Sequence, residues 1–214
     1  MLRPALRLRF RPRVTGREHV PEDGPVLLVS NHLSGLDTIL IPSFSPRKVQ
    51  FLAKDSLFAS RVGGWFFRSI GAIPVRRSAS SAAQAALDAG REVLDAGSVF
   101  AVFPEGSRSR DGRLHRGRSG AAWLALRTGA AVVPVGLIGT NRRLVGARGG
   151  PDRVELRFGR PIPLGDLSGL PAGRARTEAT ARIMAAIQGL TGQELADSYA
   201  EGTGGGCAGL RPRR

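Results

Sequence analysis

Short apolar runs that alternate with helix-like segments are the feature that most constrains the fold of this chain of 214 residues. Each run is bounded by glycine, proline or polar residues, as buried strands usually are. The runs are Val26–Ser30, Val49–Ala53, Ile73–Val75, Ser98–Phe103 and Ala131–Ile138. Strands that alternate with helices favour a largely parallel sheet with covered faces. The sequence therefore predicts a single α/β domain with a central, mostly covered β-sheet flanked by helices.

Three segments predict helices that pack on this sheet. They are Ala79–Ala96, Gly120–Thr128 and Arg174–Ala200. Ser78 or Ser80 is available as N-cap of the first, and Gly97 is its stop signal. Interruptions of the third are expected at Gly189 and Gly192.

Two further features concern the strands. Val154–Phe158 alternates apolar and polar residues and predicts a half-buried strand. Pro134 lies inside the run Ala131–Ile138 and has no N–H for a ladder. A bulge or a locally unpaired position is therefore expected there.

The length allows one sizeable core, which we place in residues 21–200. Residues 1–20 form a basic segment that could contact a membrane surface, and the glycine-rich tail 201–214 is expected to be disordered. Cys207, the single cysteine, lies in this tail, which fits a reducing cytosolic environment. No apolar run approaches the roughly 18 residues of a spanning helix, and the N-terminus lacks the apolar core of a signal peptide. The expected location is the cytoplasmic face of the cell membrane, as a peripheral protein.

The formal net charge of +15 is almost entirely arginine, since Lys48 and Lys54 are the only lysines. The arginines gather in two clusters, Arg3, Arg7, Arg9, Arg11 and Arg13 near the N-terminus and Arg108, Arg110, Arg113, Arg116 and Arg118 further on. Such clusters attract anions: nucleic acid, anionic lipid or phosphorylated substrates. A basic nucleic-acid-binding module is the alternative from another functional class, but aromatic residues are only 6% and no nucleic-acid-binding motif occurs. We therefore expect an anionic membrane surface and a phosphorylated substrate as partners, and no nucleic acid.

Segment Ser56–Ile70 concentrates much of the chain's aromatic content. Arg61 and Arg68 are interspersed among the apolar side chains, and arginine stems can lie along apolar surface while their charged ends reach water or phosphate. One interpretation is a helix in a membrane interface. The other is that these side chains fill the core beside the sheet.

Polar motifs follow two of the predicted strands directly, where α/β proteins place functional residues. They are NHLSGLD at Asn31–Asp37 and FPEGSRSR at Phe103–Arg110. GAIPVRR at Gly71–Arg77 and VVPVGL at Val132–Leu137 complete a set of four. In this order and at these intervals, over about residues 24–139, they resemble the four sequence blocks of the glycerolipid acyltransferase superfamily. The resemblance is strongest to bacterial 1-acyl-sn-glycerol-3-phosphate acyltransferases (lysophosphatidate acyltransferases).

The resemblance implies transfer of a fatty acyl group from acyl-CoA or acyl carrier protein to the sn-2 hydroxyl of 1-acylglycerol-3-phosphate. The product would be phosphatidic acid, in phospholipid biosynthesis. This chain departs from the family pattern at Arg76, where an acid is common, and at Ser107, where threonine is usual. Neither change removes a group that the chemistry needs.

The chemistry can also be argued from the side chains. Acyl transfer to an alcohol needs a base, and His32 is the candidate because a neutral imidazole serves this role near pH 7. Asp37 can accept the other imidazole N–H and fix the tautomer. His19 and His115 lie outside any comparable context. The catalytic residues are therefore predicted to be His32 and Asp37.

A covalent nucleophile is not expected. Cys207 lies in the tail, and GRSG at Gly117–Gly120 is followed by Ala121 instead of completing a nucleophile elbow. We therefore predict direct attack by the acceptor hydroxyl in a ternary complex, without an acyl-enzyme, a cofactor or a metal. Backbone N–H groups near Gly35 or Gly106 are the candidate oxyanion donors.

The phosphate and glycerol of the acceptor are assigned to Lys54, Arg77, Glu105, Gly106, Ser107 and Arg108. Arg108 offers a planar fork for phosphate. Glu105 is expected to bind the glycerol hydroxyl or to orient Arg108, the alternative being an acid that only neutralises nearby arginines. The acyl or acceptor pocket is assigned to Gly71, Pro134 and Gly136. Another lysolipid, such as a lyso-ornithine lipid or a lysophospholipid with a larger head group, is the alternative acceptor, and the sequence leaves the oligomeric state open.

Overall fold

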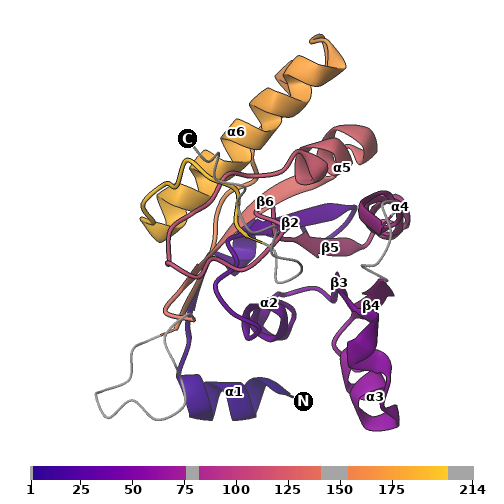
Figure 1. Cartoon of the computed structure of the whole chain (residues 1–214), viewed down its shortest axis with the longest axis vertical. Coiled ribbons are helices and arrows are strands. Elements are labelled where there is room, and N and C mark those ends of the chain that lie inside the picture. Colours follow the sequence, from indigo (N-terminus) through magenta and orange to yellow (C-terminus); the bar gives the residue numbers. More distant parts are fainter. Residues whose placement is uncertain (1, 76–81, 141–153, 202–214) are drawn as a thin grey trace, which may run out of the picture.

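A seven-stranded sheet in the order β1-β7-β6-β2-β5-β3-β4 crosses the middle of the computed structural model, which describes residues 2–75, 82–140 and 154–201 (Figure 1). The strands are β1 Arg13–Thr15, β2 Val26–Ser30, β3 Val49–Lys54, β4 Ala72–Val75, β5 Val99–Val102, β6 Ala131–Ile138 and β7 Glu155–Phe158. Strands β6, β2, β5, β3 and β4 are parallel neighbours, whereas β7 runs antiparallel to β6 and parallel to β1.

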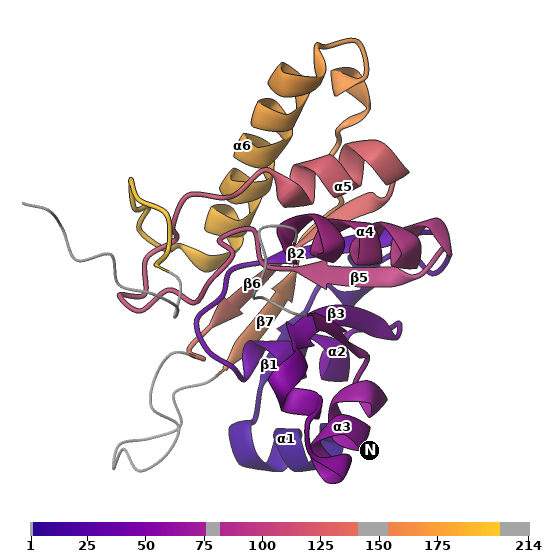
Figure 2. The ribbon, with the colours of Figure 1, turned by 45° about the vertical axis from the view of Figure 1, so that its right-hand side comes forward.

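Helices lie on both faces of the sheet, which confirms the predicted α/β fold (Figure 1). The helices are α1 Leu2–Phe10, α2 Asp37–Phe44, α3 Arg61–Ser69, α4 Ala82–Asp95, α5 Gly120–Thr128 and α6 Ala172–Thr191. Short 3-10 turns occur at Arg17–His19, Asp55–Phe58 and Gly165–Leu167. Helices α4, α5 and α6 cover one face, and α2 covers the other, with α1 packed beside it. Figure 2 shows α1 and α3 at one end of the molecule and α6 at the other.

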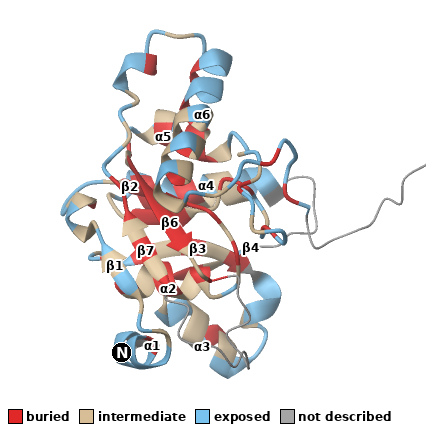
Figure 3. Cartoon of the chain, turned by 90° about the vertical axis from the view of Figure 1, so that its left-hand side faces the viewer, coloured by how far each residue is buried: buried red, intermediate tan, exposed pale blue. Residues whose placement is uncertain are grey.

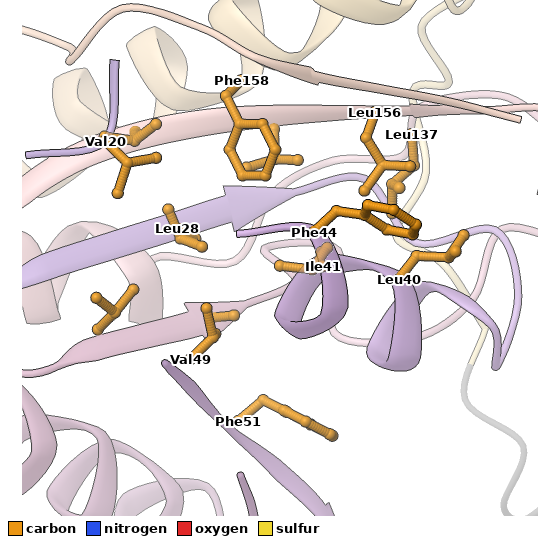
Figure 4. Close-up of a cluster of buried hydrophobic side chains, with 14 of the residues drawn as sticks. Val20, Leu28, Leu40, Ile41, Phe44, Val49, Phe51, Leu137, Leu156 and Phe158 are labelled. Carbon is orange, nitrogen blue, oxygen red and sulfur yellow. The ribbon is translucent and has the colours of Figure 1, made fainter. Parts of the chain in front are cut away.

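The central strand β2 is buried on both faces, and its alternate side chains divide the core in two. Val26 and Leu28 belong to the cluster with α2, whereas Leu27 and Val29 belong to the cluster with α4, α5 and α6. Figure 3 shows the buried residues along the strands and the exposed ones on the outer helix faces. Figure 4 shows side chains of α2 against the sheet, with Leu40, Ile41 and Phe44 near Leu28, Leu137, Leu156 and Phe158. Full burial of each such side chain stabilises the fold by about 1.5–3 kcal/mol.

Strand β6 accommodates Pro134 without an extra residue of its own. Its pairing with β2 continues through Val29↔Pro134 without an extra residue. The carbonyl of Pro134 accepts the N–H of Gly159 at 2.8 Å, so the proline nitrogen faces the β7 side of the strand. The β6–β7 ladder begins only at Val135↔Phe158. On this side the register shifts by one residue, because Val135 pairs with Phe158 and Val132 pairs with Ile162, so the partner segment has one extra residue opposite Pro134. The missing N–H therefore falls at an interruption of the ladder, as the sequence predicts.

The C-terminal helix differs from the prediction. Helix α6 continues through Gly189 and ends at Gly192, whose φ of 68° is the left-handed conformation of a C-cap. The residues after it are not helical, since they run beside an earlier loop: the N–H of Leu114 donates to Glu194 O at 2.8 Å and the N–H of Ala196 donates to Leu114 O at 2.9 Å. The predicted helix is therefore too long at its C-terminal end.

Three elements were not predicted: α1, β1 and α2. Strand β1 lies within the segment 1–20 and pairs with β7, so part of that segment belongs to the sheet. Ser78 and Ser80, the proposed N-caps, and the tail with Cys207 lie outside the described residues.

Segment Ser56–Ile70 divides between the core and the surface. Phe58, Phe67 and Ile70 pack against the core beside the sheet. Val62 and Trp65 on α3 are instead 78% and 71% exposed. Over the described ranges, none of the helices has the length and apolar character to cross a bilayer.

Candidate active site

The two polar motifs meet at one edge of the sheet. NHLSGLD follows β2 and FPEGSRSR follows β5, and these strands are parallel neighbours with Val29 beside Val102. Because parallel strands end at the same edge, their carboxyl ends bring the two motifs together.

His32 and Asp37 form the hydrogen-bonded pair that the sequence predicted. His32 Nδ1 lies 2.9 Å from Asp37 Oδ2, and Asp37 is fully buried whereas the histidine side chain is 15% exposed. An ionised carboxylate can only accept, so Nδ1 carries the proton and Nε2 is the basic nitrogen. Asp37 is fixed in turn, since its Oδ2 also accepts the N–H groups of Leu33 at 2.6 Å and Ser34 at 2.8 Å.

The segment after β5 holds His32 from three sides. The ring of Phe103 stacks on the imidazole with centroids 4.0 Å apart. The N–H of His32 donates to Glu105 Oε1 at 2.9 Å, and the N–H of Ser109 donates to His32 O at 2.8 Å. The ring and both main-chain groups of the histidine are therefore contacted by one segment.

The structure corrects the expected role of Glu105. Its side chain is fully buried, and its second oxygen, Oε2, accepts the N–H of His115 at 3.0 Å. Burial raises the pKa of Glu105, while the two backbone N–H groups oppose the rise. Both oxygens therefore bind main-chain groups instead of a glycerol hydroxyl or Arg108. His115, which the sequence set aside, supplies one of these donors.

Arg108 is an exposed cation beside this turn. Among the described residues it has no ion-pair or hydrogen-bond partner, so its guanidinium is available to an anion. Ser107 Oγ donates to Glu201 O at 2.9 Å and so contacts the C-terminal segment. Lys54 is the last residue of β3, and Arg77, like Arg76, lies outside the described residues.

Gly106 has a left-handed backbone conformation, which favours glycine. Its φ is 76°, and a Cβ placed there would lie 2.8 Å from Arg118 Nε. The guanidinium of Arg118 lies 5.3 Å from the ring centroid of Tyr199. The N–H of Gly106 itself donates to Phe103 O at 3.0 Å within the turn. The expectation that backbone N–H groups near Gly35 or Gly106 are the oxyanion donors stays a prediction.

The three residues assigned to an acyl or acceptor pocket are packing positions. Gly71 has φ 88°, and a Cβ there would lie 2.1 Å from Val49 O. A Cβ on Gly136 would lie 2.8 Å from Leu190 Cβ on α6. Pro134 belongs to the buried strand β6. Backbone and helix contacts account for these residues, and their assignment to an acyl or acceptor pocket stays a prediction.

Asn31 is a buried residue of the site that sequence reasoning missed. Its amide binds both main-chain groups of Leu137 at 2.8 Å, tying the end of β2 to β6. It also donates to Gln193 Oε1 at 2.8 Å, and Gln193 donates to Gly112 O at 2.7 Å. The position of Asn31 between an apolar strand and a histidine was the signal available in the sequence.

The described part of the site thus combines an oriented base with an unpaired cation. Within the described ranges, no three His, Cys, Asp or Glu side chains cluster so as to hold a metal ion. A base of this kind can withdraw a proton from a hydroxyl, and the arginine can hold an anionic group.

Comparisons with known proteins agree with this chemistry. A family model described as "Acyltransferase" matches residues 11–138. A chloroplastic 1-acyl-sn-glycerol-3-phosphate acyltransferase of Arabidopsis thaliana is 35% identical over 62% of this chain and 37% of that protein. A protein of the same name from Bacillus subtilis is 28% identical over 80% of this chain and 83% of that protein.

A solved structure extends the likeness to the fold. The crystal structure of the 1-acyl-sn-glycerophosphate acyltransferase of Thermotoga maritima superposes with a TM-score of 0.64 at 27% identity, covering 84% of this chain and 71% of that one. The chain spans about two fifths of the length of the first plant relatives, at 37% and 39%. The matched region contains both motifs and the strands that carry them, and the chain belongs to the acyltransferase family.

Proposed function

We propose that this protein transfers a fatty acyl group to the sn-2 hydroxyl of 1-acylglycerol-3-phosphate, making phosphatidic acid for phospholipid biosynthesis. The observation that carries the proposal is the His32–Asp37 pair, which leaves Nε2 of His32 as the basic nitrogen. The main chain of His32 is hydrogen-bonded to Glu105, in the same turn as Arg108. The names of the relatives support the acceptor.

The proposed reaction is a direct displacement. His32 Nε2 takes the proton of the acceptor hydroxyl while the oxygen attacks the carbonyl carbon of the acyl thioester. The tetrahedral intermediate then collapses, the carbon–sulfur bond breaks, and the imidazolium returns the proton to the leaving thiolate. Asp37 stabilises the imidazolium between the two steps. The product is an ester and a free thiol, of coenzyme A or of acyl carrier protein.

The phosphate of the acceptor is assigned to Arg108. A guanidinium binds phosphate with two parallel hydrogen bonds, which places the neighbouring hydroxyl at a fixed distance. Lys54, at the end of β3, and Arg77, after β4, are proposed as the additional cations.

The decisive assay uses purified protein, lysophosphatidate and a labelled acyl-CoA or acyl carrier protein, with phosphatidate as the readout. His32→Ala should lower kcat about 10²- to 10⁴-fold, the usual contribution of a general base. A His32→Ala protein that retains near-normal activity would contradict the mechanism. If lyso-ornithine lipid is acylated and lysophosphatidate is not, the acceptor assignment fails while the reaction class stands.

Arg108→Ala gives a separate test of phosphate binding. We expect KM for lysophosphatidate to rise more than kcat falls, because a substrate contact made equally in ground and transition states acts on KM. Arg110→Ala, an exposed arginine two residues away, is the matched control and should change KM little.

We also propose that the end of the molecule with α1 and α3 contacts an anionic membrane surface at the cytoplasmic face. Figures 1 and 2 place both helices at this end. Leu8 on α1 is 81% exposed, and exposed arginines accompany the exposed apolar residues of both helices. Helix α1 packs on α2, and its Arg3 donates to the carbonyls of Ser43 and Ser45 at the C-terminal end of that helix.

A further inference from the structure

A fully buried carboxylate, Glu105, lies directly behind the main chain of His32. Its oxygens divide between two backbone donors, with Oε1 2.9 Å from His32 N and Oε2 3.0 Å from His115 N. A buried carboxylate is costly unless its oxygens are bonded, and here removal of either donor would leave part of the charge uncompensated. This buried carboxylate therefore lies next to the proposed catalytic base.

We propose that Glu105 is a positioning residue, which acts on the reaction through His32 and does not touch the acceptor. It fixes the peptide of His32 and thereby the direction in which the imidazole leaves the chain. This inference rests on the acyl transfer proposed above, in which His32 Nε2 must meet the acceptor hydroxyl.

The surrounding contacts explain why a hydrogen bond to the main chain of His32 also fixes the position of its imidazole. The N–H of Ser109 binds His32 O at 2.8 Å, so the residue is held on both sides of its Cα. The ring lies between two further restraints, the stacked ring of Phe103 and the carboxylate of Asp37. Rotation of the His32 peptide would move Nδ1 away from Asp37, and a misplacement of about 1 Å can lower a rate about 10²-fold.

The turn that carries Glu105 is itself anchored. The N–H of Gly106 donates to Phe103 O at 3.0 Å, and the N–H of Arg118 donates to Pro104 O at 2.8 Å. Through its second oxygen the carboxylate also holds His115, whose imidazole contacts Asp111 at 3.0 Å. One side chain thus fastens the NHLSGLD segment to both ends of the loop after β5.

The test compares kcat with KM. Glu105→Gln keeps the shape of the side chain but replaces one carboxylate oxygen with an NH₂ group. This NH₂ group faces the backbone N–H of His32 or of His115, so one hydrogen bond is lost and two donors lie against each other. We expect kcat to fall about 10- to 100-fold, while KM for lysophosphatidate changes less than about twofold. Glu92→Gln, an exposed carboxylate on α4, is the matched control and should leave both constants unchanged.

A second measurement is independent of activity. In the ¹⁵N-labelled wild type, the backbone amide signals of His32 and His115 should shift together as the Glu105 carboxyl takes up its proton. Burial raises the pKa of this carboxyl, so the midpoint should lie above the ordinary value of 4.5. The imidazole C–H signals of His32 and His115, the titratable groups that act on Glu105, are followed in the same series to separate their transitions. Glu105→Gln should abolish the shared amide transition.

The outcomes separate the roles. A rise in KM with kcat unchanged would make Glu105 an acceptor ligand and overturn the inference, as would two amides that do not titrate together. If Glu105→Gln does not fold, Glu105→Asp, which keeps the charge but shortens the side chain, gives the same comparison of kcat with KM. A wild type that makes no phosphatidate would refute the proposed function, while the amide titration would still decide whether Glu105 holds the two backbone groups.

Discussion

At the residue scale, one oxygen of Asp37 accepts three N–H groups, from His32, Leu33 and Ser34. This carboxylate therefore shapes the turn and selects the histidine tautomer at the same time. We expect Asp37→Asn to lower kcat about 10²- to 10⁴-fold, because the amide can present its NH₂ to Nδ1 and favour the wrong tautomer. Asp37 is also the first residue of α2, where loss of the charge alone costs about 0.3–1 kcal/mol. The NH₂ would in addition oppose the N–H groups of Leu33 and Ser34, so the total loss of stability should be larger. Steady-state kinetics well below the melting temperature checks this, and a near-normal kcat would show that tautomer selection is not needed.

Glu105 should give the stability of the protein a specific pH dependence. Burial raises its pKa in the folded state, so the folded protein holds this proton at pH values where the unfolded chain has released it. The stability due to this group therefore falls as pH rises from the unfolded pKa to the folded one. Relative to Glu105→Gln, the wild type should lose free energy of unfolding across that window. Urea unfolding of both proteins at a series of pH values measures the difference, since the other groups cancel. If the free energy of unfolding of the wild type instead rose with pH relative to that of Glu105→Gln, the direction of the pKa shift would be contradicted.

At the scale of elements, glycines allow β3, β4 and the helices to approach closely. Gly71 and Gly24 have similar positive φ values of 88° and 72°, but a Cβ on Gly71 would meet Val49 O at 2.1 Å, and a Cβ on Gly24 would meet nothing within 4 Å. Gly24→Ala should therefore cost only the backbone strain, about 1 kcal/mol, whereas Gly71→Ala should cost clearly more.

Chemical denaturation of the two variants measures this difference, and the Gly24 variant is the control for φ alone. Equal costs would mean that the backbone of β3 moves aside freely. If Gly71→Ala folded with normal stability but lost activity, the result would support the predicted assignment of this glycine to a substrate pocket.

The sequence predicts best the elements that are determined by their own residues. Strands β2 and β6 and helix α5 have the predicted bounds, because their apolar runs and end signals are local. Strand β1 has only three residues, Arg13–Thr15, and exists because β7 offers an edge to pair with. Helix α2 is apolar and contains Pro42, so its helical character is not visible in a periodic pattern.

The site follows the same rule. The pairing of His32 with Asp37 is visible because the two residues are close in sequence and their chemistry is complementary. The partners of Asn31, Leu137 and Gln193, lie 106 and 162 residues further along the chain. Glu105 likewise binds backbone N–H groups, which every residue except proline has, so no sequence pattern marks its partners. Such contacts depend on the tertiary fold and need a structure.

At the scale of the whole molecule, the residues after α6 lie along the loop that follows β5. The segment after α6 pairs with the loop that follows β5, and Gln193, Ser198 and Glu201 bond to Gly112, Arg116 and Ser107. This segment lies beyond residues 11–138, which the family model matches. Residues outside the four motifs thus contribute directly to the rigidity of the site.

The arrangement of the whole molecule determines which surface can contact a membrane, because the exposed apolar residues of α1 and α3 lie at one end (Figure 2). We expect Arg7→Glu on α1 to weaken binding to anionic vesicles roughly 30-fold, because it changes two units of charge at about 1 kcal/mol each. Arg127→Glu, on exposed surface of α5, makes the same change of net charge elsewhere and is the control. Trp65→Ser should weaken binding to neutral and anionic vesicles alike, since it removes apolar area. Co-sedimentation with phosphatidylglycerol-containing and pure phosphatidylcholine vesicles measures both effects. Equal losses for Arg7→Glu and Arg127→Glu would show that net charge, and not this end of the molecule, drives the binding.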